Sequence, residues 1–556
     1  MKDQQPGQEL NLYALTPPWG DRPSIYQFIL DNKDADGRID SYLELPDEAL
    51  IRGDNKYGFA PGALDGMFLH MDELELCGNC DAEDTPAEAE KTELHDQKIF
   101  SALQNLIAEP TDASAALLYS LLLQQHALAY ITPLIGTIEK SPDLPSERIV
   151  EAGHWLATSA ADREAVKAGM AFLSICRSSA YRQLFLTLGL HEEFTMYAAA
   201  SLRYSEAEPD RFIQELAESV WGWGRVSLVE QLASTNDPDI KRWMLIKGFH
   251  NSVECHEVVL ICAQVGDLYT ALLDPNPDDE VLESAGEILH TLMYSHGRQL
   301  LITKFANAAE TTLLYLRHLQ THEMSIEAFF NVKLIRLFLR RDRDAIVSSD
   351  PEWSDRKDEM LTLIDAIFAR PEWKDRVRER LASDDNWEFG RAVKMAAAIG
   401  LDIWETCFTR LQQNGDWSYI TLSLNEERLG RLLAYAEGLF PIDQFPSGQK
   451  EVDDKVRSTI FCLHQTLWRY PGKGCAFILA GLRSPSDLNR TDAAYVLAIW
   501  PHYAWSEEME AALRSAIARE EDPEVKELMQ KTLSGDEAIR SRAIDRLSFH
   551  DKFFEY

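Results

Sequence analysis

The chain has 556 residues, of which 45% are hydrophobic and 26% are charged, and this composition excludes an intrinsically disordered protein. The length predicts either several domains or one extended repeat array. The 91 acidic side chains outnumber the 55 Lys and Arg side chains, and the formal net charge of −36 would repel nucleic-acid phosphate. We therefore expect no direct nucleic-acid binding and favour a protein partner with a basic surface. A bound cation is an alternative explanation of the acidic excess. The simplest explanation is that the acidic side chains serve only solubility.

Nothing in the sequence predicts export or insertion into a membrane. Residues 1–10 lack the basic start and the apolar run of a signal peptide. The most apolar window, residues 115–136, is interrupted by polar side chains and by Pro133, so it predicts a buried helix pair rather than a membrane span. Most of the eight cysteines stand alone in apolar helical stretches, as reduced core residues do. We expect a cytoplasmic protein without a membrane partner.

Residues 1–93 are acidic and rich in turns, and they predict a small, irregular N-terminal cap region. Turn-forming Pro, Gly and Asp residues cluster at 17–20, 34–37 and 59–66. The phrases at 45–48 and 59–66 also resemble uncharacterised bacterial proteins, some of them labelled terpene hydroxylases. No residue of this chain supports that activity.

One loop of this region resembles the first half of an EF-hand calcium loop. Side chains with oxygen stand at its positions 1, 3, 5 and 9: Asn32, Asp34, Asp36 and Asp40. Gly37 and Ile39 occupy positions 6 and 8, and residues 25–30 are suited to an entering helix. Position 12, where a bidentate Glu closes the cage, is Leu43, and Glu44 comes one residue late. The main alternative to calcium binding is an ordinary turn formed around Gly37.

Cys77 and Cys80 form an isolated Cys-x-x-Cys motif, with His70 upstream. A structural zinc site needs four ligands, and no second pair of cysteines lies nearby in the sequence. A redox role would require a thioredoxin-like βα setting, which the sequence does not indicate. A plain loop is the simplest interpretation.

Residues 94–556 show helical periodicity almost throughout. Apolar residues at 281, 282, 285, 288, 289, 292 and 293 share one helix face, and acidic residues 278–280 precede them, as expected at the positive end of a helix dipole. A second such helix follows Asn425, a good N-cap. Strand patterns are sparse, and about two dozen helices joined by short turns are expected. The predicted fold class is all-α.

A short motif of Pro, an acidic residue and an aliphatic residue recurs at the start of several predicted helices. It stands at 237–240, 277–281, 485–488 and 522–525, at intervals that suit a helix-pair repeat. Residues 487–497 and 522–533 resemble the inner helices of HEAT repeats, and the resemblance is best over residues 475–550. It implies a HEAT-like α-solenoid, in which a curved surface binds other macromolecules.

Three His-Glu pairs suggest a metal-dependent alternative. They are His191-Glu192, His256-Glu257 and His322-Glu323. Among HEAT-repeat proteins, the deoxyhypusine hydroxylases hold a di-iron centre with four such pairs, and His with carboxylate is a ligand set for iron and oxygen chemistry. This chain has three pairs, and none has the Arg-His-Glu-Ala context of that family. Chance spacing is the competing explanation.

Two further patterns indicate possible partner-binding residues. Trp221 and Trp223 flank a glycine at a predicted inter-helix turn, where indoles can either anchor a partner or pack on neighbouring helices. Lys333, Arg336 and Arg340 share one stripe of a predicted helix, where an anionic ligand could dock, or where the helix is simply solvated.

No nucleophile elbow, dinucleotide fingerprint or phosphate loop is present, so a catalytic residue is not predicted. We expect a non-catalytic binding or scaffold protein with no cofactor. A bacterial immunity or inhibitor protein that neutralises a basic toxin is one form of this hypothesis. The alternative is a HEAT-repeat oxygenase that uses iron on the His-Glu pairs.

Overall fold

The computed structural model describes residues 11–40, 43–48, 86–253, 256–295, 300–342, 345–421, 424–439 and 454–547. In these residues the chain forms 29 α-helices with a few short 3-10 or π turns and no strand, which confirms the predicted all-α class. No helix in the described residues combines the length and the apolar character needed to cross a bilayer. Cys176, Cys262, Cys407, Cys462 and Cys475 are free thiols, and three of them are partly exposed.

The chain divides into two compact units. Unit 1 comprises Met1–Asn331 and Asp342–Glu359. Its helices, in chain order, are η1 (Leu12–Ala14), α1 (Ile25–Asp31), α4 (Pro86–Ala108), α5 (Asp112–Leu122), α6 (Ala127–Glu139), α7 (Ser146–Ser159), α8 (Arg163–Ser174), η3 (Ser179–Tyr181), α9 (Arg182–Leu188), α10 (Glu192–Ser205), α11 (Pro209–Ala217), α12 (Trp223–Gln231), α13 (Pro238–Trp243), η4 (Met244–Gly248), α14 (His256–Val265), α15 (Leu268–Leu273), α16 (Asp279–Met293), η5 (Leu301–Lys304), α17 (Ala308–His318), α19 (Ile346–Ser349) and α20 (Pro351–Ser354).

Unit 2 comprises Val332–Arg341 and Met360–Tyr556. Two helices, α18 (Ile326–Arg341) and α21 (Lys357–Phe368), run from one unit into the other. The remaining helices of unit 2 are α22 (Glu372–Leu381), α23 (Asn386–Ala398), α24 (Trp404–Asn414), α25 (Glu426–Leu439), α26 (Asp454–Leu467), α27 (Cys475–Arg483), α28 (Asp487–Ile499), η8 (His502–Ala504), α29 (Glu507–Arg519), α30 (Pro523–Ser534) and α31 (Glu537–Leu547).

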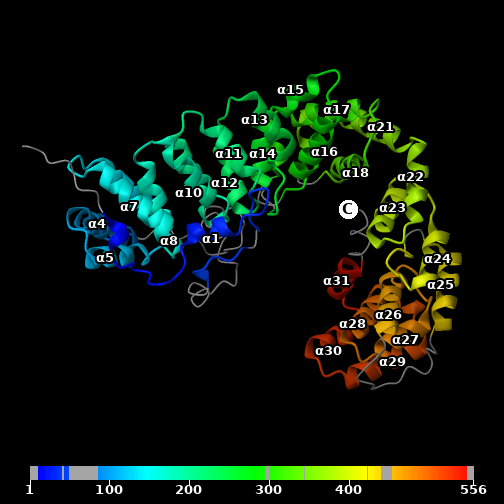
Figure 1. Cartoon of the computed structure of the whole chain (residues 1–556). Helices are drawn as coiled ribbons and strands as arrows, with labels where there is room; N and C mark the ends of the chain where they lie inside the picture. The colour runs from blue at the N-terminus through cyan, green and yellow to red at the C-terminus, as the bar shows by residue number, and fades with distance from the viewer. Residues whose placement is uncertain are drawn as a thin grey trace, which may run out of the picture. The chain divides into compact units, whose positions relative to one another are not determined.

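Within unit 1, helices that alternate along the chain stack side by side. The helices α8, α10, α12, α14 and α16 each contact the next member of this series, and α11 contacts α13 beside them (Figure 1). Each helix therefore buries apolar surface against its sequence neighbour and against its next-but-one neighbour.

The predicted helix starts are confirmed by their caps. The Asp278 side chain accepts a hydrogen bond from Val281 N at 3.0 Å at the start of α16. Asn425 Oδ1 accepts one from Arg428 N at 2.9 Å at the start of α25. Asp237 and Asp522 cap α13 and α30 in the same way, each with Pro at the first helical position. The window 115–136 forms the expected helix pair, α5 and α6, whereas α4 begins before the predicted boundary at residue 94.

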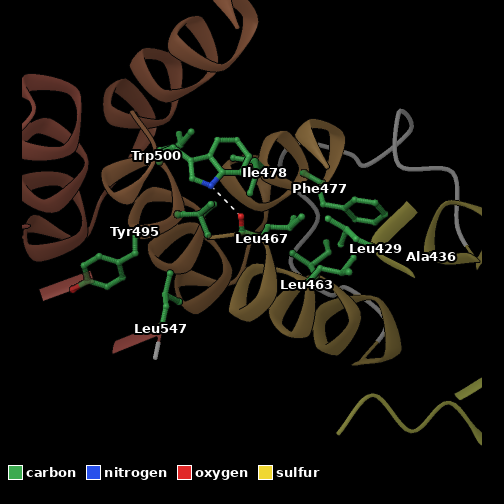
Figure 2. Packing of buried hydrophobic residues seen from close by; sticks show 14 of the residues in the cluster. Leu429, Ala436, Leu463, Leu467, Phe477, Ile478, Tyr495, Trp500 and Leu547 are labelled. Atoms are coloured by element: carbon green, nitrogen blue, oxygen red, sulfur yellow. Dashed lines mark hydrogen bonds between the residues drawn. The ribbon is translucent and has the colours of Figure 1, made fainter. Parts of the chain in front are cut away.

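Unit 2 has a continuous apolar core between its last helices. Leu463 and Leu467 of α26 pack with Phe477 and Ile478 of α27, and Trp500 closes the cluster at the end of α28 (Figure 2). The buried Trp500 indole donates its Nε1–H to Leu467 O at 3.0 Å. The bulky ring is thus buried without an unsatisfied donor, which an apolar core requires.

Candidate functional site

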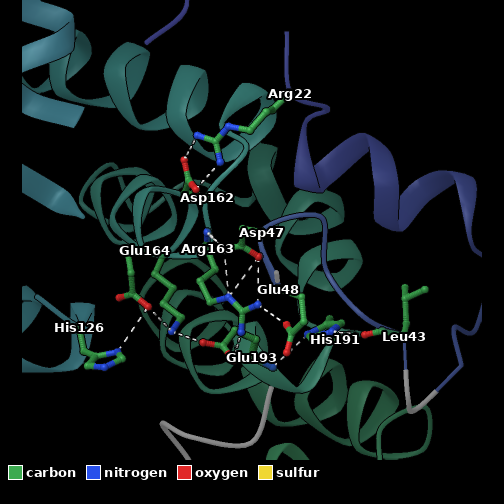
Figure 3. A network of polar contacts seen from close by, with 11 residues as sticks. Arg22, Leu43, Asp47, Glu48, His126, Asp162, Arg163, Glu164, His191 and Glu193 are labelled. Carbon is green, nitrogen blue, oxygen red and sulfur yellow. Dashed lines mark hydrogen bonds and ion pairs between the residues drawn. The ribbon is translucent and has the colours of Figure 1, made fainter. Parts of the chain in front are cut away.

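A buried ionic network surrounds α8 in unit 1. The Arg163 guanidinium contacts Asp47, Glu48 and Glu193 (Figure 3). Lys167 Nζ, one turn further along α8, contacts Glu164 and Glu193. Lys167 has no exposed surface, and Arg163 is 2% exposed. Buried charges are tolerated only when they are paired and hydrogen-bonded, so these contacts fix the geometry around α8.

This network attaches the N-terminal segment to the helices. Asp47 and Glu48 bring their carboxylates to Arg163 from more than a hundred residues away along the chain. Arg22 makes a two-pronged ion pair with Asp162, whose carboxylate also accepts from the buried Tyr119 hydroxyl. The described part of the segment predicted as a cap therefore belongs to unit 1 and supplies two of the four carboxylates of the network.

His191 and Glu192, the first predicted metal-ligand pair, have structural partners. His191 Nδ1 accepts a hydrogen bond from Glu193 N at 3.2 Å and caps α10, while Nε2 lies 2.9 Å from Leu43 O and donates to it. Burial lowers the pKa of His191 to about 4, so the ring is neutral near pH 7. The Glu192 carboxylate accepts from Trp223 N at the start of α12. Both side chains are committed to fixing helix ends.

Glu192 also makes unit 1 sensitive to pH. Burial raises its pKa from an ordinary 4.5 to about 7, against the hydrogen bonds from Trp223 N and Gly224 N. A raised pKa stabilises the fold while the carboxyl is protonated, and this contribution is lost as the pH rises from 4.5 through 7. We expect Glu192→Gln, which keeps the acceptor oxygen, to have a free energy of unfolding about 3 kcal/mol higher than wild type at pH 8. Urea unfolding at pH 4 and pH 8 checks this, because the two proteins should be nearly equal in stability at pH 4, below the ordinary pKa of 4.5.

The other predicted metal ligands do not join this pair. His256 and Glu257 lie in the first turn of α14, and His322 and Glu323 follow α17. His322 Nδ1 lies 2.9 Å from His318 O, one helical turn back. Across the described ranges, no group of three or more His, Cys, Asp or Glu side chains is placed to hold a metal ion.

The calcium-like loop forms a turn around Asp34. The Asp34 carboxylate accepts from Asp36 N and Arg38 N, and Gly37 has φ +77°, a conformation that favours glycine. Asn32 donates its side-chain amide to Phe28 O at the end of α1. Two of the four predicted ligands, Asn32 and Asp34, thus form side-chain hydrogen bonds with the backbone. The other two, Asp36 and Asp40, also lie in the described residues. Cys77, Cys80 and His70 lie outside the described residues.

The two tryptophans predicted to anchor a partner differ in their exposure to solvent. Trp223 opens α12 and is buried, whereas Trp221 lies in the turn after α11 and remains 45% exposed. Gly222 has φ +76°, and a side chain there would collide with the Glu192 carboxylate. Asn251 closes the turn: it accepts from Gly222 N at 2.8 Å and donates to Gly222 O at 3.0 Å. Trp221 is therefore held at the surface by a defined turn.

Trp221 lines a cleft of about 520 Å³ in unit 1. Beneath it, the Arg225 guanidinium carbon lies 5.0 Å from the Trp221 ring and 5.5 Å from the Trp243 ring. Arg225 is 4% exposed and donates to Ala217 O and Lys247 O. The polar residues that line the cleft are Arg38, Glu218, Arg225, Lys247, His250, Glu280, Glu283, Ser284 and Glu287. The cleft thus combines an exposed indole with four carboxylates and three basic side chains.

The carboxylates of α16 reach the cleft together because of their spacing. Glu280, Glu283 and Glu287 are three and four residues apart and therefore share one helix face. Glu280 pairs with Arg242 at 3.1 Å, and Glu287 lies 3.3 Å from His250 Nε2. The sequence pattern marked this face only as the polar side of an amphipathic helix, so the carboxylate row escaped prediction as a site.

The predicted basic stripe on α18 is largely covered. Lys333 is buried, and Arg336 stacks on the Phe368 ring at 4.4 Å and donates to Ala398 O. Arg340 is the exposed member of the three and lies 3.9 Å from Asp365. Arg340 is thus the most accessible residue of this stripe, and Arg336 is only partly exposed.

Comparisons with protein-family models, with curated proteins and with solved structures gave no match to this chain. Its function must therefore be inferred from its own residues.

Proposed function

We propose that the chain is a non-catalytic protein-binding protein that takes a partner with a basic surface. The observation that carries this proposal is the cleft of unit 1, where the exposed Trp221 stands beside the carboxylates of Glu218 and of α16. Tryptophan is enriched among the residues that dominate binding energy, and carboxylates around it select a cationic surface. The formal charge of −36 would speed the approach of such a partner at low salt.

The arrangement of helices is consistent with this function. We propose that the alternating contacts of α8 to α16 in unit 1 belong to a HEAT-like solenoid, whose repeated faces bind macromolecules. An immunity or inhibitor protein for a basic toxin is one biological form of the proposal. Neither the helix contacts nor the described side chains favour an oxygenase over this function.

The test is affinity purification of the tagged full chain from its host at physiological salt, followed by reconstitution with the purified partner. We expect a stoichiometric partner whose affinity falls as the salt concentration rises. Trp221→Ala should release the partner, because it removes the exposed indole. Trp387→Ala is the matched control: Trp387 is 64% exposed in unit 2, and its loss should leave the complex intact. A complex that forms equally well with both variants, or no stoichiometric partner at all, would count against the proposal.

A further inference from the structure

We propose that the Trp221 cleft receives a single arginine or lysine side chain of the partner, together with a carbonyl group of the partner's main chain. This inference rests on the proposed function and specifies its site. The cleft is built from one unit and from several helices, so its parts are held in fixed relation: Trp221 after α11, Arg225 on α12, Trp243 at the end of α13 and the carboxylates on α16.

The first step concerns the carboxylates, because they are not equivalent. Glu280 and Glu287 already have partners in Arg242 and His250. Glu218 and Glu283 are exposed and make no ion pair within the part of the chain that the structure describes, although Glu218 lies near the Arg225 charge. Two exposed carboxylates that form no ion pair, in the same cleft as an exposed indole, are suited to a cationic group.

The second step concerns the indole. Trp221 lies over Arg225 in a cation–π contact, and Asn251 closes its turn through the backbone of Gly222, so the main chain there loses little freedom when a partner binds, while the exposed indole can still shift. Nearly half of its surface is exposed. The aliphatic stem of an arginine or lysine can lie along such a ring while its charged end reaches a carboxylate.

The third step concerns two buried donors in the cleft wall. Arg225 Nε and Trp243 Nε1 are inaccessible to water and have no hydrogen-bond partner among the described residues. A buried donor without an acceptor is costly, and native proteins leave few of them. A main-chain carbonyl that enters beside Trp221, with a small shift of that side chain, supplies the missing acceptor. A basic residue within a polypeptide offers both the cation and the carbonyl.

An anionic ligand is the competing occupant, because Arg38 and Lys247 line the same cleft. The two occupants predict opposite effects for one variant. Lys247→Glu adds a carboxylate to the cleft, so it should tighten the binding of a cation and abolish the binding of an anion.

The test uses the full chain labelled with 5-fluorotryptophan and observed by ¹⁹F NMR. The resonance missing from Trp221→Phe identifies Trp221. The probes are acetyl-Gly-Arg-Gly-amide, the same peptide with uncharged citrulline in place of Arg, and the same peptide with Glu. We expect the Arg peptide to shift the Trp221 resonance in a salt-sensitive manner, and the other two to leave it unchanged.

Variants assign the contact to the cleft. Glu283→Lys should lower the affinity for the Arg peptide by roughly tenfold or more, as expected when a close attraction becomes a repulsion. Glu437→Lys, at an exposed site on α25, changes the net charge equally and should have no effect. Binding of the citrulline peptide as tightly as the Arg peptide, or loss of binding in Lys247→Glu, would overturn the inference. If the peptides fail while Trp221→Ala still releases a protein partner, this inference is wrong and the proposed function stands.

Discussion

Replacement of Lys167 by Met is expected to lower the free energy of unfolding by about 3–5 kcal/mol, the usual cost of removing one partner from a buried ion pair. Lys167 has no exposed surface, and its Nζ lies 3.0 Å from Glu164 Oε1 and contacts Glu193. The network holds two cations and four carboxylates, so the loss of Lys167 leaves a single cation, Arg163. Methionine fills a similar volume, which restricts the change to the charge. Urea unfolding followed by circular dichroism measures the effect.

The same substitution at Lys531 serves as the control. Lys531 pairs with Glu527 one helical turn away, but both side chains are largely exposed, and solvent screens such pairs. We expect Lys531→Met to unfold at almost the same urea concentration as wild type. Equal stability of Lys167→Met and Lys531→Met would mean that the network contributes little to the fold.

The pH dependence of Lys167→Met provides a second readout. Burial would raise the pKa of Glu164, yet Lys167 and the hydrogen bonds from His126 and Ala127 N hold that pKa at about 2. A lowered pKa stabilises the fold above the ordinary value of 4.5, and this contribution is lost as the pH falls toward 2. Without Lys167 the pKa of Glu164 should rise, so the variant should show less of this acid-induced loss than wild type.

The local structure of the chain could be predicted because it depends on neighbouring residues. The acidic residues at 278–280 and Asn425 indicated helix starts, and the structure uses Asp278 and Asn425 as caps. The inter-helix turn at Trp221 could be predicted for the same reason. Whether each indole would be exposed was left open by the sequence, since burial depends on which helix packs above it.

The buried network could not be predicted, because its members are brought together by tertiary packing. Asp47 and Arg163 are separated by 116 residues, and an acidic residue in a polar segment gives no sign of burial. One signal was present: Arg163 and Lys167 stand one turn apart in a helix otherwise rich in Ala, Gly and apolar residues. Two cations in such a stretch indicate buried partners, although not which ones. The His191-Glu192 pair shows the reverse case, in which a ligand-like pattern serves two helix ends.

Substitution of Gly169 is the second change for which we expect a large effect. A Cβ at Gly169 would lie 2.6 Å from Ala157 N and 2.8 Å from Gly153 O, and backbone atoms cannot move aside as a flexible side chain can. Gly153 meets α8 in the same way, with Gly169 O 2.9 Å from its would-be Cβ. The helices α7 and α8 therefore touch backbone to backbone at these two residues. We expect Gly169→Ala to cost about 3 kcal/mol, the upper range for overpacking, and Gly169→Val to cost more.

The control for Gly169→Ala is the same substitution at Gly136, in the neighbouring α6. A Cβ at Gly136 meets nothing within 4 Å, and Ala is favoured over Gly inside a helix by about 1 kcal/mol, so Gly136→Ala should stabilise the chain. If Gly→Ala lowers the free energy of unfolding at position 169 and raises it at position 136, a general effect of helix propensity is excluded. Because Arg163 and Lys167 lie on the same helix as Gly169, displacement of α8 should also disturb the ionic network. Gly169→Ala combined with Lys167→Met should then cost less than the sum of the two single changes, whereas strict additivity would show that the glycine contact and the network stabilise unit 1 independently.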